Sequence, residues 1–116
     1  MDHAKTVHEA LHYIENKRHD LLITDMVLKK ALAGLDFIKE IRSRSDLDHT
    51  PILAITAVDD VTRRVAILNA GCNDYLIKPI IESEFFARIN NLLSLKELFD
   101  QLTRERLRLI ELATKD

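Results

Sequence analysis

The sequence predicts an α/β domain in three layers, with a parallel sheet between layers of helices. Three short apolar runs, at residues 21–24, 52–55 and 75–77, each end at a polar residue and have the length and composition of buried strands. Four amphipathic or helix-compatible segments precede, separate and follow these runs. Because helices and strands alternate, we expect parallel strands joined by right-handed crossovers.

The first half of the chain supplies two helices and one strand. A helix is expected over residues 5–17, where four apolar residues recur at helical spacing: Val7, Ala10, Leu11 and Ile14. The first strand, at 21–25, ends at Asp25, and an irregular loop over 26–33 is expected to lead to Gly34. A second helix follows, with Leu35, Ile38 and Ile41 on one stripe.

The second half repeats this plan twice. Residues 46–51 are expected to form a loop, because Pro51 lacks an amide donor and favours extended geometry at Thr50. After the strand at 52–56, Asp59 or Asp60 can cap a third helix, and Gly71 suits its left-handed end. The inward face of that helix is predicted to carry Val61, Val65 and Leu68. A strand at 74–78 and a long helix, capped by Ser83 and free of glycine and proline, complete the chain.

Composition narrows the class of protein. A chain of 116 residues fits one domain, and a net charge of -2 with a sequence pI near 6.2 argues against binding to nucleic acid or anionic membrane. We therefore expect protein partners. The single cysteine, Cys72, excludes an intramolecular disulfide and fits a reducing, cytoplasmic compartment. No apolar run has the length of a signal peptide core or a membrane span.

Three different polar side chains follow the three predicted strands: Asp25, Thr56 and Lys78. Carboxyl ends of parallel strands meet at one edge, where open α/β sheets bind ligands. A carboxylate can accept a phosphoryl group, a hydroxyl can hydrogen-bond its oxygens, and an ammonium can offset its charge. Together they predict phosphoryl chemistry, although Asp25 alone would equally well cap the following loop.

The segments LLITDMVL (21–28), ILAITA (52–57) and AGCNDYLIKP (70–79) resemble the response-regulator receiver domain of two-component signalling. The resemblance covers roughly residues 1–93 and implies a parallel sheet of receiver, or flavodoxin-like, type. It implies that Asp25 is the phospho-acceptor, that Lys78 and Thr56 contact the phosphoryl group, and that Tyr75 is the switch aromatic. A cis Lys78–Pro79 bond is also implied. The implied partner is a histidine kinase or phosphotransfer protein, and the implied role is a switch rather than an enzyme acting on a free substrate.

The chain departs from the family pattern at its amino-terminal end. A family member opens with a strand that ends in two adjacent acidic residues, then a helix and a second strand, and this chain matches only the end of that second strand. We therefore expect an amino-terminally truncated receiver. In the family the acidic pair holds Mg²⁺ with the acceptor aspartate and a backbone carbonyl, which match Asp25 and Val27 here. Because Asp25 and Val27 alone make a poor magnesium site, impaired metal binding is predicted. The alternative is a degenerate pseudo-receiver that acts as a dimerisation or interaction module.

A metal enzyme is a minor alternative. The stretch His8-Glu9-Ala10-Leu11-His12 satisfies the H-E-x-x-H pattern, which places two imidazoles on one helical face for zinc. The apolar stripe of this helix, however, turns both histidines towards the flank and the solvent. No third zinc ligand stands out in the sequence.

The last helix and the first strand both predict a homo-oligomer. Residues 94–116 are expected to form a signalling or dimerisation helix after an incomplete receiver-like domain at 1–93. Its apolar residues Leu95, Phe99, Leu102 and Leu109 approximate a seven-residue repeat that Arg106 interrupts. The strand at residues 20–25 should expose an edge, so this edge, the first helix or the last helix is expected to pair with another chain. The ending LATKD resembles the junction with a diguanylate-cyclase (GGDEF) domain, and an HD-GYP or other output stays open.

Overall fold

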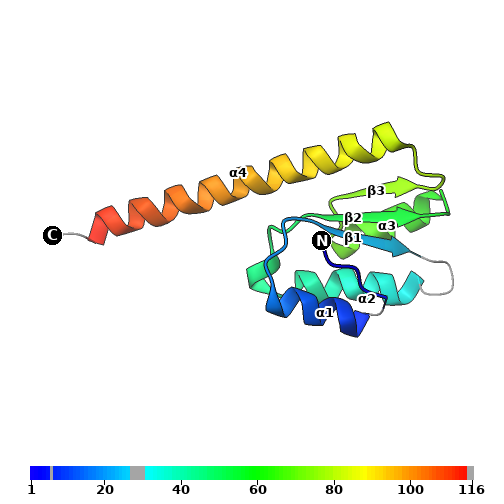
Figure 1. Cartoon of the computed structure of the whole chain (residues 1–116), viewed down its shortest axis with the longest axis horizontal. Helices are drawn as coiled ribbons and strands as arrows, with labels where there is room; N and C mark the ends of the chain where they lie inside the picture. The colour runs from blue at the N-terminus through cyan, green and yellow to red at the C-terminus, as the bar shows by residue number, and fades with distance from the viewer. Residues whose placement is uncertain (6, 27–30, 115–116) are drawn as a thin grey trace.

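A computed structural model describes residues 1–5, 7–26 and 31–114, with the side chains of residues 7 and 31–33 left aside. Its eight elements follow in the order α1 (Val7–Asn16), β1 (Leu22–Met26), α2 (Ala31–Arg42), η2 (Ser45–Leu47), β2 (Ile52–Thr56), α3 (Val61–Ala70), β3 (Asp74–Ile77) and α4 (Glu82–Thr114). The strands lie at the centre, with α1 and α2 on one side and α4 on the other (Figure 1). The predicted α/β arrangement in three layers is confirmed.

The sheet is parallel and has the order β1-β2-β3. All five residues of the central strand β2 are buried, as expected for a strand covered on both faces. The register pairs Met26 with Thr56 and Thr56 with Ile77, so the carboxyl ends of all three strands lie level. The backbone amide of Lys78 also donates to the Thr56 carbonyl oxygen at 2.8 Å, which brings Lys78 to the same edge.

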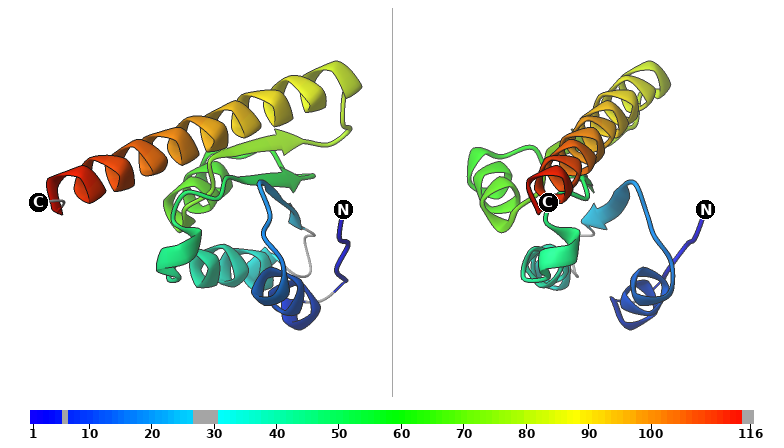
Figure 2. Two further views of the ribbon diagram at one scale, coloured as in Figure 1. Left: turned by 60° about the vertical axis from the view of Figure 1, so that its left-hand side comes forward. Right: turned by 90° about the vertical axis from the view of Figure 1, so that its left-hand side faces the viewer.

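Two apolar clusters occupy the two faces of the sheet. The first joins β1 and β2 to three helices and has Ile38, Ile41, Ile52 and Ile67 fully buried at its centre, with α1 contributing Ala10, Leu11 and Ile14. The second lies under α4 and joins Leu53, Ile55 and Leu76 to Leu92. Within the described chain α4 is the one helix that packs on this second face (Figure 2).

The prediction of a loop over residues 26–33 is wrong at both ends of that range. Met26 belongs to β1, and α2 begins at Ala31, because the run Ala-Leu-Ala has high helix propensity. Gly34 therefore lies inside the helix rather than before it. A Cβ atom at Gly34 would lie 2.6 Å from the Met26 Sδ atom, so glycine permits the close approach of α2 to β1. A short 3₁₀ helix, η2, also occupies part of the expected loop at 46–51.

The inward face predicted for α3 is wrong. Val61, Val65 and Leu68 are 43–64% exposed, and the buried residues are Ile67 and Ala70. The spacing of apolar residues in α3 allows more than one apolar stripe, and it does not show which of them meets the sheet. The carboxyl end of α3 is fixed by Arg42 of α2, whose Nε donates to the Gly71 carbonyl oxygen at 2.8 Å. This contact orients Ile67 and Ala70 towards the first cluster.

Both ends of α3 agree with the prediction. The Asp60 carboxylate accepts a hydrogen bond from the Arg63 amide at 2.8 Å, so Asp60 rather than Asp59 is the cap. Gly71 ends the helix in the left-handed region with φ 115°.

The last helix starts two residues earlier than a cap at Ser83 predicts, and it continues past residue 93 as expected. Its first turn is closed by the bond from the Phe85 amide to the Ile81 carbonyl oxygen, at 2.9 Å, which leaves Ser83 inside the helix. The Lys78–Pro79 bond before it is cis, as the resemblance implied. Every residue from 101 to 114 is exposed, so the second half of α4 projects beyond the sheet (Figure 1).

Candidate functional site

Asp25 and Lys78 form an ion pair at the carboxyl edge of the sheet. The Lys78 Nζ atom donates to Asp25 Oδ2 at 2.9 Å, although the two residues come from opposite sides of β2. Both side chains are about half exposed, at 50% for Asp25 and 41% for Lys78. Because both side chains are exposed, a ligand can reach them. An exposed ion pair contributes only roughly 0–1 kcal/mol to the free energy of folding, so we expect this pair to matter little for stability.

Thr56 ends the central strand at this edge, and its side chain is fully buried. Its Oγ1 atom accepts a hydrogen bond from the Val58 amide at 3.2 Å and lies 3.4 Å from the Val58 carbonyl oxygen. The hydroxyl is therefore bonded to the loop between β2 and α3. A ligand on Asp25 that accepts a hydrogen bond from this hydroxyl would have to break its bonds to Val58. The loop between β2 and α3 would then lose these two hydrogen bonds.

Tyr75 lies on β3 with its ring packed against the first apolar cluster. Its hydroxyl accepts a hydrogen bond from Arg64 Nη1 of α3 at 3.3 Å. The Arg64 Nε atom lies 3.3 Å from Asp59 Oδ1 in the loop after Thr56. The hydrogen bond to Tyr75, aided by the charge of Asp59, raises the pKa of the Arg64 guanidinium above its usual value. Tyr75 is thus connected, through Arg64, to the loop that holds the Thr56 hydroxyl.

Arg64 is the residue that sequence reasoning missed. Its position three residues before the buried Ile67 places it on the inward side of α3, next to the sheet. No sequence pattern pointed to its partner, because the bond between Arg64 and Tyr75 depends on how α3 is placed on the sheet.

The described residues do not fit a magnesium site. Mg²⁺ requires near-octahedral oxygen ligands, and the Oδ2 atom of Asp25 already accepts from Lys78. Across residues 1–5, 7–26 and 31–114 no group of three or more His, Cys, Asp or Glu side chains could hold a metal ion. Val27, whose backbone carbonyl the resemblance implied as a ligand, lies outside the described residues.

The zinc alternative gains no support from the first helix. His8 and His12 are exposed on α1, and the Glu9 carboxylate accepts a hydrogen bond from the Lys5 amide at 3.2 Å. His12 Nδ1 lies 3.4 Å from the Asn16 side-chain nitrogen, one turn along the same helix. The described part of the chain adds no third ligand to this pair.

Cys72 has a structural role. Burial raises the pKa of its thiol, and the Sγ atom donates to the Asp74 carbonyl oxygen at 2.7 Å. A thiol that is buried and protonated is a poor nucleophile and metal ligand.

A family model and similar known proteins point to the same family. Residues 1–90 match the family model described as the response regulator receiver domain. The chain is 42% identical over 92 residues to the response regulator MprA of Mycobacterium ulcerans, covering 79% of this chain and 38% of that protein. It is 36% identical over 86 residues to the sensor histidine kinase TmoS of Ectopseudomonas mendocina, covering 74% of this chain and 9% of that protein. The chain thus spans well under half the length of these relatives.

Solved structures agree with this result. A crystal structure assigned to a response regulator of Chloroflexus aurantiacus matches with a TM-score of 0.72 and 35% identity, covering 78% of this chain and 74% of that chain. The chemotaxis protein CheY4 of Vibrio cholerae matches with a TM-score of 0.69 and 25% identity, covering 77% of this chain and 73% of that chain. Among the helices that the structure describes, none has the length and apolar character needed to cross a membrane.

Proposed function

The chain belongs to the response-regulator receiver domain family, and we propose that it takes part in phosphorelay signalling with Asp25 as its phospho-acceptor position. The observation that carries the proposal is the Asp25–Lys78 pair, which joins a nucleophilic carboxylate to a cation at 2.9 Å on an open edge. A histidine kinase or a phosphotransfer protein is the proposed donor. The protein acts as a switch in the cytoplasm and does not turn over a free substrate.

The proposed transfer uses a carboxylate oxygen of Asp25 as nucleophile. This oxygen forms a bond to the phosphorus of a phosphohistidine, and the phosphorus–nitrogen bond breaks with its electron pair returning to the donor imidazole. Lys78 offsets part of the charge on the transferring group, because its ammonium already lies beside Asp25.

The signal would spread from Asp25 through the loop after β2. A phosphoryl oxygen on Asp25 offers the Thr56 hydroxyl a charged acceptor in place of the Val58 carbonyl. Moving this hydroxyl displaces the loop that carries Asp59, and Asp59 pairs with Arg64, the donor to Tyr75. Residues 1–93 would thus form the sensing part, and the segment 94–116, which contains the second half of α4, would transmit the change.

We propose that the 116-residue chain binds magnesium weakly and that phosphorylation is consequently slow. The described residues place Asp25 beside a lysine and in no cluster of potential metal ligands. The same observation favours the second candidate function, a pseudo-receiver that keeps the fold and works as a dimerisation or interaction module. The rate of phosphorylation separates the two candidates.

We also propose that the chain forms a homo-oligomer. Ile23 of β1 is 45% exposed although its register partner Leu53 on β2 is fully buried, so one side of β1 is open within the described chain. The edge at residues 20–25, the neighbouring helix α1 and the projecting half of α4 are the candidate contacts. Light scattering over a dilution series tests this proposal, and a folded monomer at micromolar concentration would contradict it.

The phosphorylation proposal is tested by transfer from a phosphorylated histidine kinase domain to the chain. We expect slow labelling of the native chain and no labelling of Asp25→Asn. Asp20→Asn is the matched control, because Asp20 is an exposed carboxylate that precedes the same strand at its opposite end. Labelling that persists in Asp25→Asn, or that is lost in Asp20→Asn, would contradict the assignment of Asp25.

A further inference from the structure

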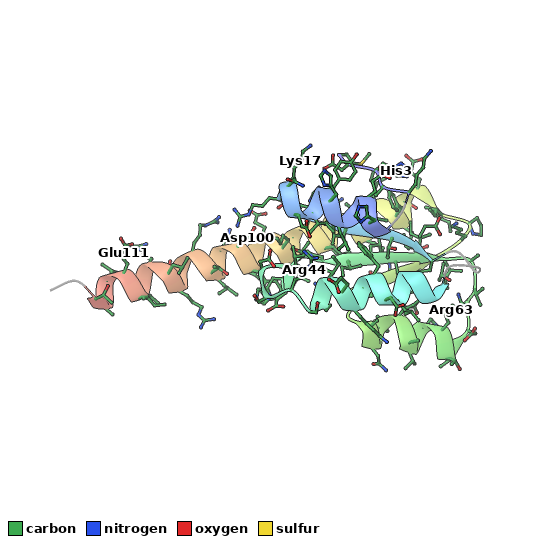
Figure 3. The ribbon with its side chains drawn as sticks, turned by 90° about the horizontal axis from the view of Figure 1, so that it is seen from below. His3, Lys17, Arg44, Arg63, Asp100 and Glu111 are labelled. Atoms are coloured by element: carbon green, nitrogen blue, oxygen red, sulfur yellow. The ribbon has the colours of Figure 1, made fainter. Side chains whose placement is uncertain are left out.

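The projecting half of α4 exposes a row of leucines that the sheet does not cover. We call the sheet with α1, α2 and α3 the body of the domain. Asp100 lies where α4 passes the end of the body, whereas Glu111 lies far beyond it (Figure 3). Four leucines on this row, Leu98, Leu102, Leu109 and Leu112, are 53–57% exposed. We propose that this row pairs with the same row of a second copy as a parallel, in-register coiled coil, held in register by Glu105 and Arg106. The inference deepens the proposed assembly through α4 and does not depend on phosphorylation at Asp25.

The structure changes the seven-residue repeat that the sequence predicted. Phe99, which that repeat included, stacks on His49 of the body with ring centroids 4.4 Å apart and an interplanar angle of 15°. Because Phe99 already has a partner, the free seam consists of the other positions with spacing three and four. These positions are Leu98, Leu102, Glu105, Leu109 and Leu112. In heptad terms Leu102 and Leu109 are a positions, and the remaining three are d positions.

The seam points away from the body, so a second helix has room. The residues of α4 that pack on the body include Phe85, Ile89, Leu92 and Phe99. With 3.6 residues per turn, the seam lies roughly a third of a turn around the helix from these residues. A second copy can therefore lie against the seam without displacing the contacts between α4 and the sheet.

Glu105 selects the orientation of the pair. In a parallel, in-register pair, each d residue packs beside the following e residue of the other helix, so Glu105 meets Arg106 of the second copy. The layer then contains two carboxylates and two guanidiniums and is neutral. Arg106, which interrupts the repeat predicted from the sequence, thus supplies the cation that neutralises Glu105.

An antiparallel pair lacks this compensation. Matching the leucines in that orientation sets Leu98 against Leu109 and places Glu105 against Leu102 of the second copy. Arg106 then lies at the level of Gln101 and cannot reach the carboxylate. A buried carboxylate without a cation is costly, so the charge pattern disfavours the antiparallel pair.

Charge reversal in the full chain tests the pairing. Glu105→Arg gives the layer four positive charges, and Arg106→Glu gives it four negative charges. By sedimentation equilibrium, we expect each variant to raise the dimer dissociation constant about tenfold or more, and the double variant to return it to within about threefold of the native value. Arg104→Glu and Glu111→Arg are matched controls, because they make the same charge changes on the side of α4 opposite the seam.

Cysteine cross-linking tests the orientation. Leu109→Cys should form a disulfide-linked dimer on mild oxidation, since a parallel pair places the two copies of residue 109 opposite each other. Leu107→Cys, on the far side of the helix, is the control and should not cross-link. The native Cys72 does not compete, because it is buried.

Each remaining outcome overturns the proposal. If Leu109→Cys fails to cross-link alone but does so when mixed with Leu98→Cys, the helices are antiparallel. If neither arrangement cross-links, or if the double charge variant is no better than the single variants, the seam is not the interface. Native-like circular dichroism of each variant shows that the helix itself is intact. These readouts involve no phosphoryl transfer, so failure here leaves the assignment of Asp25 untouched.

Discussion

The body of the protein buries large apolar side chains, whereas the projecting half of α4 exposes similar side chains to solvent. In β2 the residues Ile52, Leu53 and Ala54 have no exposed surface. In α4 every residue from 101 to 114 is exposed, and five of these are leucine or isoleucine: Leu102, Leu107, Leu109, Ile110 and Leu112. The apolar side chains of β2 are therefore covered within one chain, whereas the apolar surface of the projecting helix stays exposed until another molecule covers it.

The largest difference between the two regions should appear on truncation of a single side chain. Ile38→Ala removes a fully buried side chain from the first cluster and should lower the free energy of unfolding by about 2–5 kcal/mol. Leu107→Ala, at an exposed position outside the proposed seam, should change it by less than about 0.5 kcal/mol. Urea unfolding followed by circular dichroism gives both values. Equal losses in the two variants would show that the helix is covered in the free protein.

Removing the projecting segment should change assembly more than folding. A chain that ends at Asp100 keeps the stack of Phe99 on His49 and loses most of the seam. We expect its dimer dissociation constant to rise by about a hundredfold or more, roughly 2.7 kcal/mol, while its thermal unfolding stays cooperative. Sedimentation equilibrium makes the measurement. An unchanged oligomeric state would assign the main contact to β1 or α1 instead.

The two regions meet where His49 of the body stacks on Phe99 of α4. His49→Ala removes its ring stack with Phe99 and should lower the free energy of unfolding by about 0.5–1.5 kcal/mol. Thermal denaturation measures this loss. Asp48→Ala, next to it in the same loop, is the control and should have a smaller effect. A loss no greater in His49→Ala than in Asp48→Ala would mean that the stack does not fasten α4 to the body.

The smallest effect on stability is expected at the candidate site. Lys78→Ala breaks an ion pair between half-exposed groups and should change the free energy of unfolding by only about 0–1 kcal/mol. The same change should slow phosphorylation of Asp25, because it removes the cation beside the acceptor. A loss of several kcal/mol in Lys78→Ala would show that the pair serves the fold rather than chemistry.

The sequence predicted the parts of the fold that depend on strand ends. The apolar runs and their terminal residues placed Asp25, Thr56 and Lys78 at one edge, and the sheet register agrees. Spacing failed where two stripes of a helix were both plausible. In α3 the end of the helix is held by the hydrogen bond from Arg42 of α2 to Gly71, which joins residues 29 positions apart.

Sequence patterns could not predict the contacts between side chains that are far apart in the chain. The link from Tyr75 to Arg64 joins residues 11 positions apart, and the stack of His49 on Phe99 joins residues still further apart. Neither pair has a periodic signal, because each depends on how a helix is rotated and placed on the sheet. The roles of Asp25, Thr56, Tyr75 and Lys78 in signalling stay predictions, as does the resemblance of residues 112–116 to a diguanylate-cyclase junction.

The magnesium dependence of Asp25 phosphorylation tests the account most directly. The chain and Asp25→Asn are incubated with a small-molecule phosphodonor, with magnesium or with a chelator, and followed by intact mass. We predict a slow gain of one phosphoryl group that is absent in Asp25→Asn and nearly the same with and without magnesium, since the described residues offer no metal cluster at Asp25. A rapid gain that requires magnesium, or any gain that survives in Asp25→Asn, would contradict the account.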